Sequence, residues 1–89
     1  MIRKRVTICN KLGLHARAAA KFVTLAAQFT SDIQLARDRQ QVNGKSIMGV
    51  MMLAASQGTP LVIIACGTDA RAAVQKLTAL IKRRFDEAE

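Results

Sequence analysis

The single histidine of the chain has neighbours that suit phosphoryl chemistry. His15 follows Gly13, which frees the backbone just before it, and the residues from Ala16 onward have helical periodicity. The unpaired N–H groups at the start of such a helix form a site for an anion beside the imidazole. Arg17 adds a cation that can hydrogen-bond a phosphoryl oxygen, and the stretch offers no carboxylate or hydroxyl for a hydrolytic triad. We interpret His15 as a phosphoryl acceptor and Arg17 as the residue that stabilises the phosphoryl group; the alternative is a capping or surface histidine.

A second feature is a short apolar segment that begins at Ser46 and holds three of the four methionines. Ser46 is a good N-cap for a helix from Ile47 to about Ala55. Helical spacing gives this helix two apolar faces, one of Val50, Leu53 and Ala54 and another of Ile47, Met48 and Met51. A helix this short cannot bury both faces against a small sheet. We therefore predict that the second face is an exposed docking patch, which methionine suits, with a fully buried helix as the alternative.

Nucleotide hydrolysis, metal binding and disulfide formation are poorly supported. Gly44-Lys45-Ser46 resembles the end of a phosphate-binding P-loop, but that motif needs a glycine at position 39, which is arginine here. The two cysteines, Cys9 and Cys66, are 57 positions apart, and this spacing is typical of neither a metal site nor a disulfide framework. We expect both cysteines to be small buried hydrophobes, and we predict no metal and no cofactor.

Alternating and helical periodicities indicate the elements that position these residues. Residues 2–9 alternate as a first strand, residues 16–29 form an alanine-rich helix, and residues 32–37 and 41–43 form two further strands. The continuous apolar run of residues 61–66 predicts a central buried strand, and Val74, Leu77, Ile81 and Phe85 mark the inner face of a last helix. The order β-α-β-β-α-β-α implies an α+β fold, an antiparallel sheet with helices on one face. Nothing divides the chain, so we predict one domain over residues 1–89.

The chain is strongly basic, with fourteen Lys and Arg against six Asp and Glu and a net charge of +8. Such a charge suits nucleic acid, an acidic membrane surface, a phosphorylated ligand or acidic proteins. The 51% apolar content is ample for a core, and no apolar run approaches the roughly 18 residues of a membrane span. Residues 1–11 are basic but lack the apolar stretch of a secretory signal, so we expect a cytoplasmic protein without a membrane partner.

Nucleic-acid binding is the competing function. The chain has no Trp or Tyr, and its three Phe fall on or at the end of predicted helices, so no strand offers a ring on which bases could stack. A small basic nucleic-acid-binding module, attracted by charge alone, is therefore the alternative rather than the preferred interpretation.

Two segments together resemble the HPr family, the phosphocarriers of the bacterial phosphoenolpyruvate-dependent phosphotransferase system of sugar transport. They are Gly13-Leu14-His15-Ala16-Arg17 and Asn43-Gly44-Lys45-Ser46-Ile47-Met48-Gly49-Val50-Met51, and the similarity extends over essentially the whole chain. The resemblance implies an open-faced β-sandwich in which three helices cover one face of a four-stranded antiparallel sheet. It also implies a monomeric carrier with a transient phosphohistidine rather than a stand-alone enzyme.

The resemblance assigns roles to individual residues. His15 matches the histidine that receives a phosphoryl group on Nδ1 from phosphorylated enzyme I and passes it to an EIIA-type domain, and Arg17 matches the arginine that steadies the group. Ser46 matches the serine modified by an HPr kinase/phosphorylase in many members, and Ile47, Met48 and Met51 match the docking patch. The predicted docking surface also includes Leu14, Ala16, Ala20, Lys21 and Lys45.

One residue departs from the family pattern, and the charges near the site are few. Ala18 stands where proline is common, but alanine also builds a helix well, so we expect little effect on the chemistry. Of the basic residues, we expect Arg17, Lys21 and Lys45 near His15 and the methionines. The basic run of residues 82–84 is partly offset by the acidic side chains at positions 86, 87 and 89.

Overall fold

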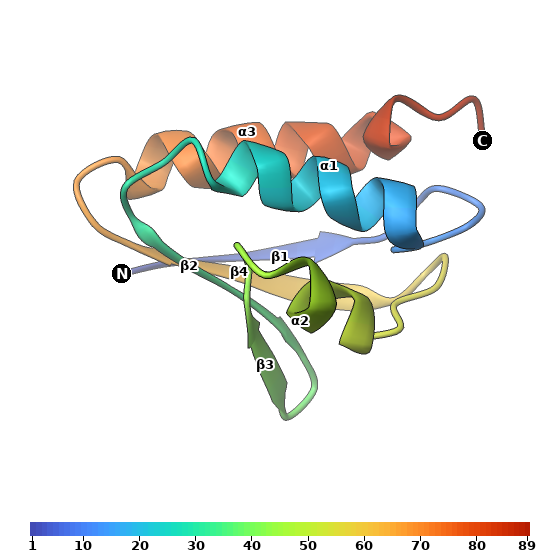
Figure 1. Ribbon diagram of the computed structural model, residues 1–89, viewed down its shortest axis with the longest axis horizontal. Helices are drawn as coiled ribbons and strands as arrows, with labels where there is room; N and C mark the ends of the chain where they lie inside the picture. Colours follow the sequence, from blue (N-terminus) through green and yellow to red (C-terminus); the bar gives the residue numbers. More distant parts are fainter.

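The computed structural model describes all 89 residues of the chain (Figure 1). Its strands are β1 (Ile2–Thr7), β2 (Asp32–Arg37), β3 (Gln40–Asn43) and β4 (Pro60–Cys66). Its helices are α1 (Ala16–Ala26), α2 (Ile47–Met52) and α3 (Ala70–Lys82), followed by a short 3-10 helix, η1 (Arg84–Asp86). The predicted order of elements and the α+β class are confirmed.

The four strands form one antiparallel sheet in the order β1-β4-β2-β3. β4 lies between β1 and β2, with Ile63 opposite Lys4 on one side and Leu35 on the other. Its inward side chains Leu61, Ile63 and Ala65 join the core under the helices, and Ile64 on the other face is still buried, with 5% of its surface exposed. Pairing along both edges and these buried side chains confirm that β4 is the central buried strand.

The helices and the sheet enclose one hydrophobic core. α1 and α3 lie side by side over the sheet, and α2 packs beside α1 and β3 (Figure 1). The buried alanines Ala18, Ala19 and Ala26 have small side chains that allow α1 to approach its neighbours closely. The largest fully buried side chains include Phe22 from α1, Leu77 and Ile81 from α3, and Ile33, Leu35 and Ile63 from the sheet.

All three helices end earlier than predicted. α1 ends before Phe29, and α2 ends at Met52 rather than Ala55. Beyond α2, Ala54 has a left-handed φ of 50°, and Nη1 of Arg37 donates hydrogen bonds to the carbonyl oxygens of Leu53 at 2.8 Å and of Ala54 at 3.0 Å. These bonds satisfy carbonyl groups that a longer helix would use internally. The early end of α2 therefore depends on a residue of β2.

Phe85 is buried as predicted, but it does not belong to α3. The helix ends at Lys82, and Arg84, Phe85 and Asp86 have left-handed φ values of 58°, 53° and 62°. This turn leaves Phe85 in the core with 0% of its surface exposed. The chain then continues beside the start of α1 (Figure 1). Residues 84–89 are called the C-terminal segment below.

The expectation for the cysteines is wrong for Cys66, which is exposed, while Cys9 is half-buried. Successive side chains of a strand point to opposite faces of the sheet. Because Leu61, Ile63 and Ala65 of β4 face the core, Cys66 at its end faces the uncovered side. Among the helices, none has the length and apolar character that crossing a membrane requires.

Candidate functional site

His15 lies at the end of the loop after β1, where it is the N-cap of α1. The N–H of Gly13 donates to the carbonyl oxygen of Asn10 at 3.2 Å, and that of Leu14 donates to the carbonyl oxygen of Ala55 at 2.8 Å. Gly13 has a left-handed φ of 69°, and a Cβ at this position would collide with the backbone of Ala55. The loop therefore needs glycine here, and its conformation places the imidazole at the start of the helix.

The two ring nitrogens of His15 have different partners. Nδ1 accepts a hydrogen bond from the backbone N–H of Arg17 at 3.3 Å, and Nε2 lies 2.5 Å from Oε2 of Glu87. A backbone N–H can only donate, and an ionised carboxylate can only accept. On the neutral ring these partners place the hydrogen on Nε2 and the free lone pair on Nδ1. The nitrogen able to act as a nucleophile therefore faces the N-terminus of α1.

Glu87 binds His15 and Asn10 through separate oxygens. Its Oε1 accepts a hydrogen bond at 3.0 Å from Nδ2 of Asn10, a fully buried side chain. Partial burial raises the pKa of the Glu87 carboxyl, but hydrogen bonds from Asn10 and His15 and the positive charges of His15 and Lys21 lower it further than burial raises it. The pKa of Glu87 thus lies below its ordinary value, which favours a charged carboxylate beside the imidazole.

Ser46 caps α2, because its Oγ accepts a hydrogen bond from the N–H of Gly49 at 3.2 Å. The predicted two faces of this helix are confirmed. Val50 and Leu53 are buried, and Met52 at the end of the helix is 67% exposed. The second face is exposed at Ile47 (40%), Met48 (69%) and Met51 (40%). These three residues are called the apolar patch below. Ala54 is the exception on the inner face, since the left-handed turn leaves it exposed.

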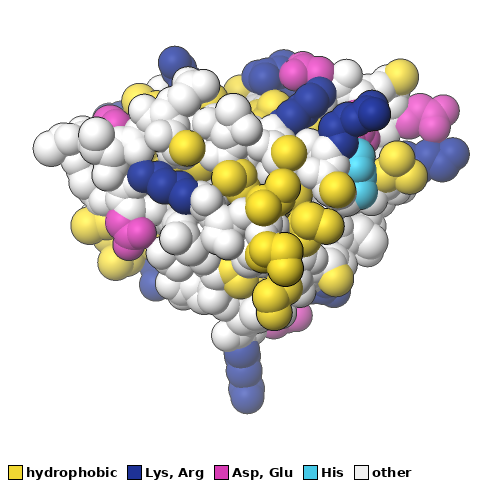
Figure 2. All heavy atoms as spheres, in the orientation of Figure 1, with side chains coloured by type: hydrophobic (Ala, Val, Ile, Leu, Met, Phe, Trp, Pro, Cys, Tyr) yellow, Lys and Arg dark blue, Asp and Glu magenta, His cyan; other side chains and the backbone are white.

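Hydrophobic and basic side chains flank the histidine on the molecular surface. Figure 2 shows the imidazole between a group of Lys and Arg side chains and a band of hydrophobic ones. Nζ of Lys21 donates to the carbonyl oxygen of Phe85 at 2.6 Å. The expectation that Lys45 lies near His15 is wrong, because its Nζ donates at 2.7 Å to the carbonyl oxygen of Phe29, which lies beyond the C-terminal end of α1. Arg17 is exposed, and its guanidinium forms no hydrogen bond or ion pair. Arg17 is therefore the cation that is free to bind an anion beside His15.

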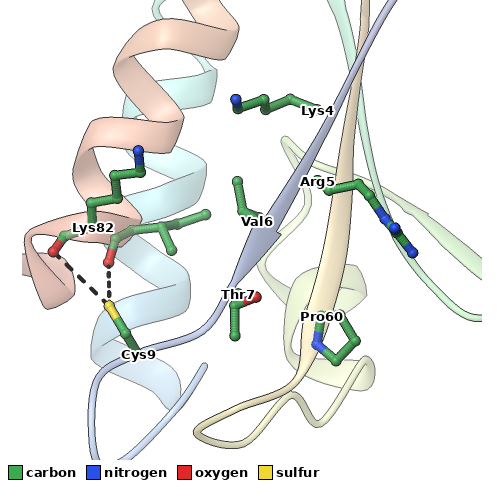
Figure 3. A pocket seen from close by; sticks show the side chains of 8 residues that line it. Lys4, Arg5, Val6, Thr7, Cys9, Pro60 and Lys82 are labelled. Atoms are coloured by element: carbon green, nitrogen blue, oxygen red, sulfur yellow. Dashed lines mark hydrogen bonds between the residues drawn. The ribbon is translucent and has the colours of Figure 1, made fainter.

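A cavity of about 660 Å³ lies apart from His15, between β1 and the C-terminal end of α3 (Figure 3). Lys4 and Lys82 extend on the helix side of β1, and Arg5 points away from it. Sγ of Cys9 lies 3.2 Å from the carbonyl oxygen of Ile81. The cavity has no carboxylate or imidazole among its lining residues, and no group of three metal-ligating side chains occurs in the structure. The candidate chemistry remains at His15.

Comparison with known proteins identifies the family. The family model for the PTS HPr component phosphorylation site matches residues 2–83. The chain belongs to the HPr family. It is 49% identical over 89 residues to the phosphocarrier protein HPr of Cupriavidus necator, with 100% of both chains covered. A crystal structure of HPr from Thermoanaerobacter tengcongensis has a TM-score of 0.96 at 44% identity, with both chains fully covered. An HPr dimer from that organism has a TM-score of 0.79 at 45% identity, covering 98% of this chain and 100% of the other.

The structure changes the docking surface that the HPr resemblance suggested. Leu14 is only 6% exposed and belongs to the core, so its side chain is not accessible to a partner. Ala16 is exposed, and Ala20, Lys21 and Lys45 are half-buried. The exposed residues of the predicted docking surface are therefore Ala16 at the start of α1 and the apolar patch on α2.

Sequence reasoning missed Glu87, which it treated with its acidic neighbours as a counter-charge to the basic end of α3. Only Asp86 has that role, since it pairs with Arg83 at 3.0 Å, while Glu89 pairs with Lys11 at 3.4 Å. Glu87 contacts His15, which is 72 positions away in the chain. No local pattern at the end of the sequence distinguishes Glu87 from the acidic residues beside it, so only the folded chain identifies it.

Proposed function

We propose that this HPr-family chain accepts a phosphoryl group on Nδ1 of His15 from phosphorylated enzyme I and passes it to an EIIA-type domain. The observation that carries this proposal is the difference between the ring nitrogens. Nε2 is covered by Glu87, whereas Nδ1 has a lone pair directed at the start of α1 and meets only the N–H of Arg17, at 3.3 Å. The cytoplasmic location and the monomeric state expected from the sequence are part of this proposal.

The transfer is an in-line displacement in which positioning and charge stabilisation supply most of the rate. The lone pair of Nδ1 forms a bond to phosphorus, and the bond from phosphorus to the donor atom of enzyme I breaks with its electron pair returning to enzyme I. The hydrogen on Nε2 stays in place. The phosphoryl group replaces the hydrogen bond between Nδ1 and the Arg17 N–H, which then faces the phosphoryl oxygens together with the Arg17 guanidinium. Transfer to the EIIA-type domain reverses these steps with a new acceptor.

The partners supply the other half of the site by covering the apolar patch. Ile47, Met48 and Met51 are exposed on α2, which packs beside α1, and methionine side chains adapt to differently shaped partner surfaces. Arg17 and Lys21 add positive charge for acidic partners. No strand carries an aromatic side chain, and Phe22 and Phe85 are fully buried, so the alternative of a nucleic-acid-binding module has no stacking surface to support it.

We also propose that Ser46 is a site of regulatory phosphorylation by an HPr kinase/phosphorylase. Ser46 is half-buried at the start of α2 and directly precedes the apolar patch. A phosphate adds about −1.5 to −2 charges. Docking of an apolar surface would remove water from this charge at a cost in free energy, and an acidic partner would be repelled by it. Ser46→Asp is expected to accept phosphate from enzyme I more slowly, while Ser46→Asn keeps a neutral cap and accepts at the wild-type rate. Equal rates for wild type and Ser46→Asp contradict this assignment.

The test of phosphoryl acceptance uses the purified chain with enzyme I, phosphoenolpyruvate and Mg²⁺. We expect an acid-labile phosphate on the wild type and none on His15→Asn, which retains a good N-cap side chain so that α1 stays intact. Arg17→Gln is expected to be labelled more slowly than wild type. Equal labelling of His15→Asn would overturn the proposed function. Light scattering of the chain, before and after labelling, measures its oligomeric state, and a stable dimer would contradict the monomeric carrier.

A further inference from the structure

We propose that Glu87 is a positioning residue that holds His15 in the one neutral tautomer able to accept a phosphoryl group on Nδ1. This inference rests on the proposed function for its kinetic consequence, although the tautomer itself can be measured without any transfer. An imidazole in solution populates both neutral tautomers, and only the form with hydrogen on Nε2 has a lone pair on Nδ1. The structure gives a specific reason for that form to dominate here.

The carboxylate of Glu87 matches two hydrogen-bond donors with its two oxygens. Oε2 faces Nε2 of His15 at 2.5 Å, and Oε1 faces Nδ2 of Asn10 at 3.0 Å. Nδ2 of Asn10 also donates to the carbonyl oxygen of Gly13 at 2.9 Å. Because both groups that contact this amide nitrogen are hydrogen-bond acceptors, the nitrogen and not the oxygen of the Asn10 amide faces them. Glu87 therefore connects the imidazole to the loop that precedes it, while Nδ1 faces the N–H of Arg17, which is a donor.

Contacts of its neighbours in the chain, besides its own hydrogen bonds to His15 and Asn10, hold Glu87 in this position. Phe85 fills the core with no exposed surface, and its carbonyl oxygen accepts a hydrogen bond from Nζ of Lys21 at 2.6 Å. On the other side of Glu87, the carbonyl oxygen of Glu89 accepts a hydrogen bond from the N–H of Lys11 at 2.6 Å. The C-terminal segment is thus attached to α1 and to the loop before it. Because both flanks are fixed, the carboxylate meets the ring without a large loss of conformational freedom at the moment of transfer.

The same contact stabilises the charge that forms in the reaction. When Nδ1 bonds to phosphorus while Nε2 keeps its hydrogen, the ring gains a positive charge. The Glu87 carboxylate lies against Nε2, and its side chain is only 16% exposed, so water screens the attraction weakly. This charge develops as the bond to phosphorus forms, so the stabilisation is greater in the transition state than in the free state, which is the condition for an interaction to accelerate the step.

Glu87→Gln tests the inference because a glutamine has nearly the same shape but only one acceptor oxygen. If that oxygen accepts from Asn10, the glutamine NH₂ faces Nε2 and favours the tautomer with hydrogen on Nδ1. If it accepts from His15, the NH₂ group opposes the donor of Asn10. Either arrangement weakens the preference seen in the wild type.

The experiment measures imidazole ¹⁵N chemical shifts of the neutral ring and the single-turnover rate of phosphoryl acceptance from enzyme I. The wild type is expected to show predominantly the Nε2–H tautomer. Glu87→Gln is expected to show a mixture and a rate about ten- to a hundredfold lower, by analogy with the loss of a group that orients a metal-ligating histidine. Glu89→Gln is the matched control, since it removes the same charge from an exposed ion pair in the same segment and should change neither quantity.

The possible outcomes separate this inference from the proposed function. A wild-type ring that is mainly the Nδ1–H tautomer, or a Glu87→Gln variant with wild-type shifts and rate, overturns the role of Glu87 while the carrier function stands. Labelling of His15→Asn as strong as that of the wild type overturns the carrier function whatever the tautomer. A thermal unfolding curve of Glu87→Gln that matches the wild type shows that a slower rate does not come from a loss of the fold.

Discussion

Replacement of Phe85 by alanine should destabilise the fold and disturb the histidine together, because this ring attaches the C-terminal segment to the core. Phe85 has 0% of its surface exposed although it follows the end of α3. Removal of a fully buried phenylalanine costs about 3 to 5 kcal/mol, which includes the cavity that it leaves. Small domains have unfolding free energies of about 5 to 15 kcal/mol, so the loss is a large fraction of the total. For a domain of this size the melting temperature should fall by roughly 15 to 25 °C.

The assay is urea and thermal unfolding followed by far-ultraviolet circular dichroism, since the chain has no Trp or Tyr for fluorescence. Phe29→Ala is the matched control: this ring is half-buried and follows the end of α1, so its loss should cost less. The second readout is the ¹⁵N spectrum of His15, which should move towards that of Glu87→Gln as the carboxylate is released. A loss of unfolding free energy below about 1 kcal/mol would refute the reasoning that Phe85 holds Glu87 in place. The same conclusion would follow if Phe85→Ala lost the expected free energy but the tautomer of His15 did not change.

Three other predictions follow from the structure. Gly13→Ala should lower the unfolding free energy, because alanine in a left-handed conformation costs roughly 1 to 2 kcal/mol and its Cβ would also collide with the backbone of Ala55. The total loss should therefore exceed that range, and a smaller loss in urea unfolding contradicts the prediction. Asp69 accepts hydrogen bonds from the Ser31 hydroxyl and from the backbone N–H of Thr30, and these lower its pKa to about 2. Since this pKa is below the ordinary value of 3.8, the stabilisation is complete above that pH and is lost as the pH falls towards about 2. Unfolding midpoints measured across this window should therefore fall more steeply for the wild type than for Asp69→Asn, and parallel curves would contradict the assignment. Met48→Asp, at a side chain that is 69% exposed, should leave the unfolding free energy within about 0.5 kcal/mol while slowing phosphoryl acceptance from enzyme I; wild-type transfer would exclude Met48 from the docking surface.

Much of the fold could be predicted because its signals are local. Alternation along β1 and β2, the apolar run of β4 and the helical spacing of Val50 and Leu53 depend on neighbours within a few residues. The predicted ends of elements were less accurate, because distant groups contribute to them. Arg37 binds the carbonyl groups beyond α2, and the last helix ends before Phe85 although the apolar spacing continues to it. Cys66 shows the same limit, since its apolar neighbours suggested burial but its side chain falls on the uncovered face of the sheet.

The features of the candidate site also fall into those that depend on neighbouring residues and those that depend on distant ones. The sequence by itself determined that His15 precedes a helix beside Arg17 and that Ser46 caps a helix with one core face and one exposed face, because capping and helical periodicity act over one or two turns. The family resemblance implied Nδ1 as the acceptor, but only the tertiary structure shows why Nδ1 is available and which residue covers Nε2. That choice depends on a hydrogen bond between atoms of residues 72 positions apart, and these meet because a buried Phe85 and the paired α1 and α3 bring the end of the chain to its beginning. Such a contact depends on atomic distances in the packed fold, which the order of residues along the chain does not contain.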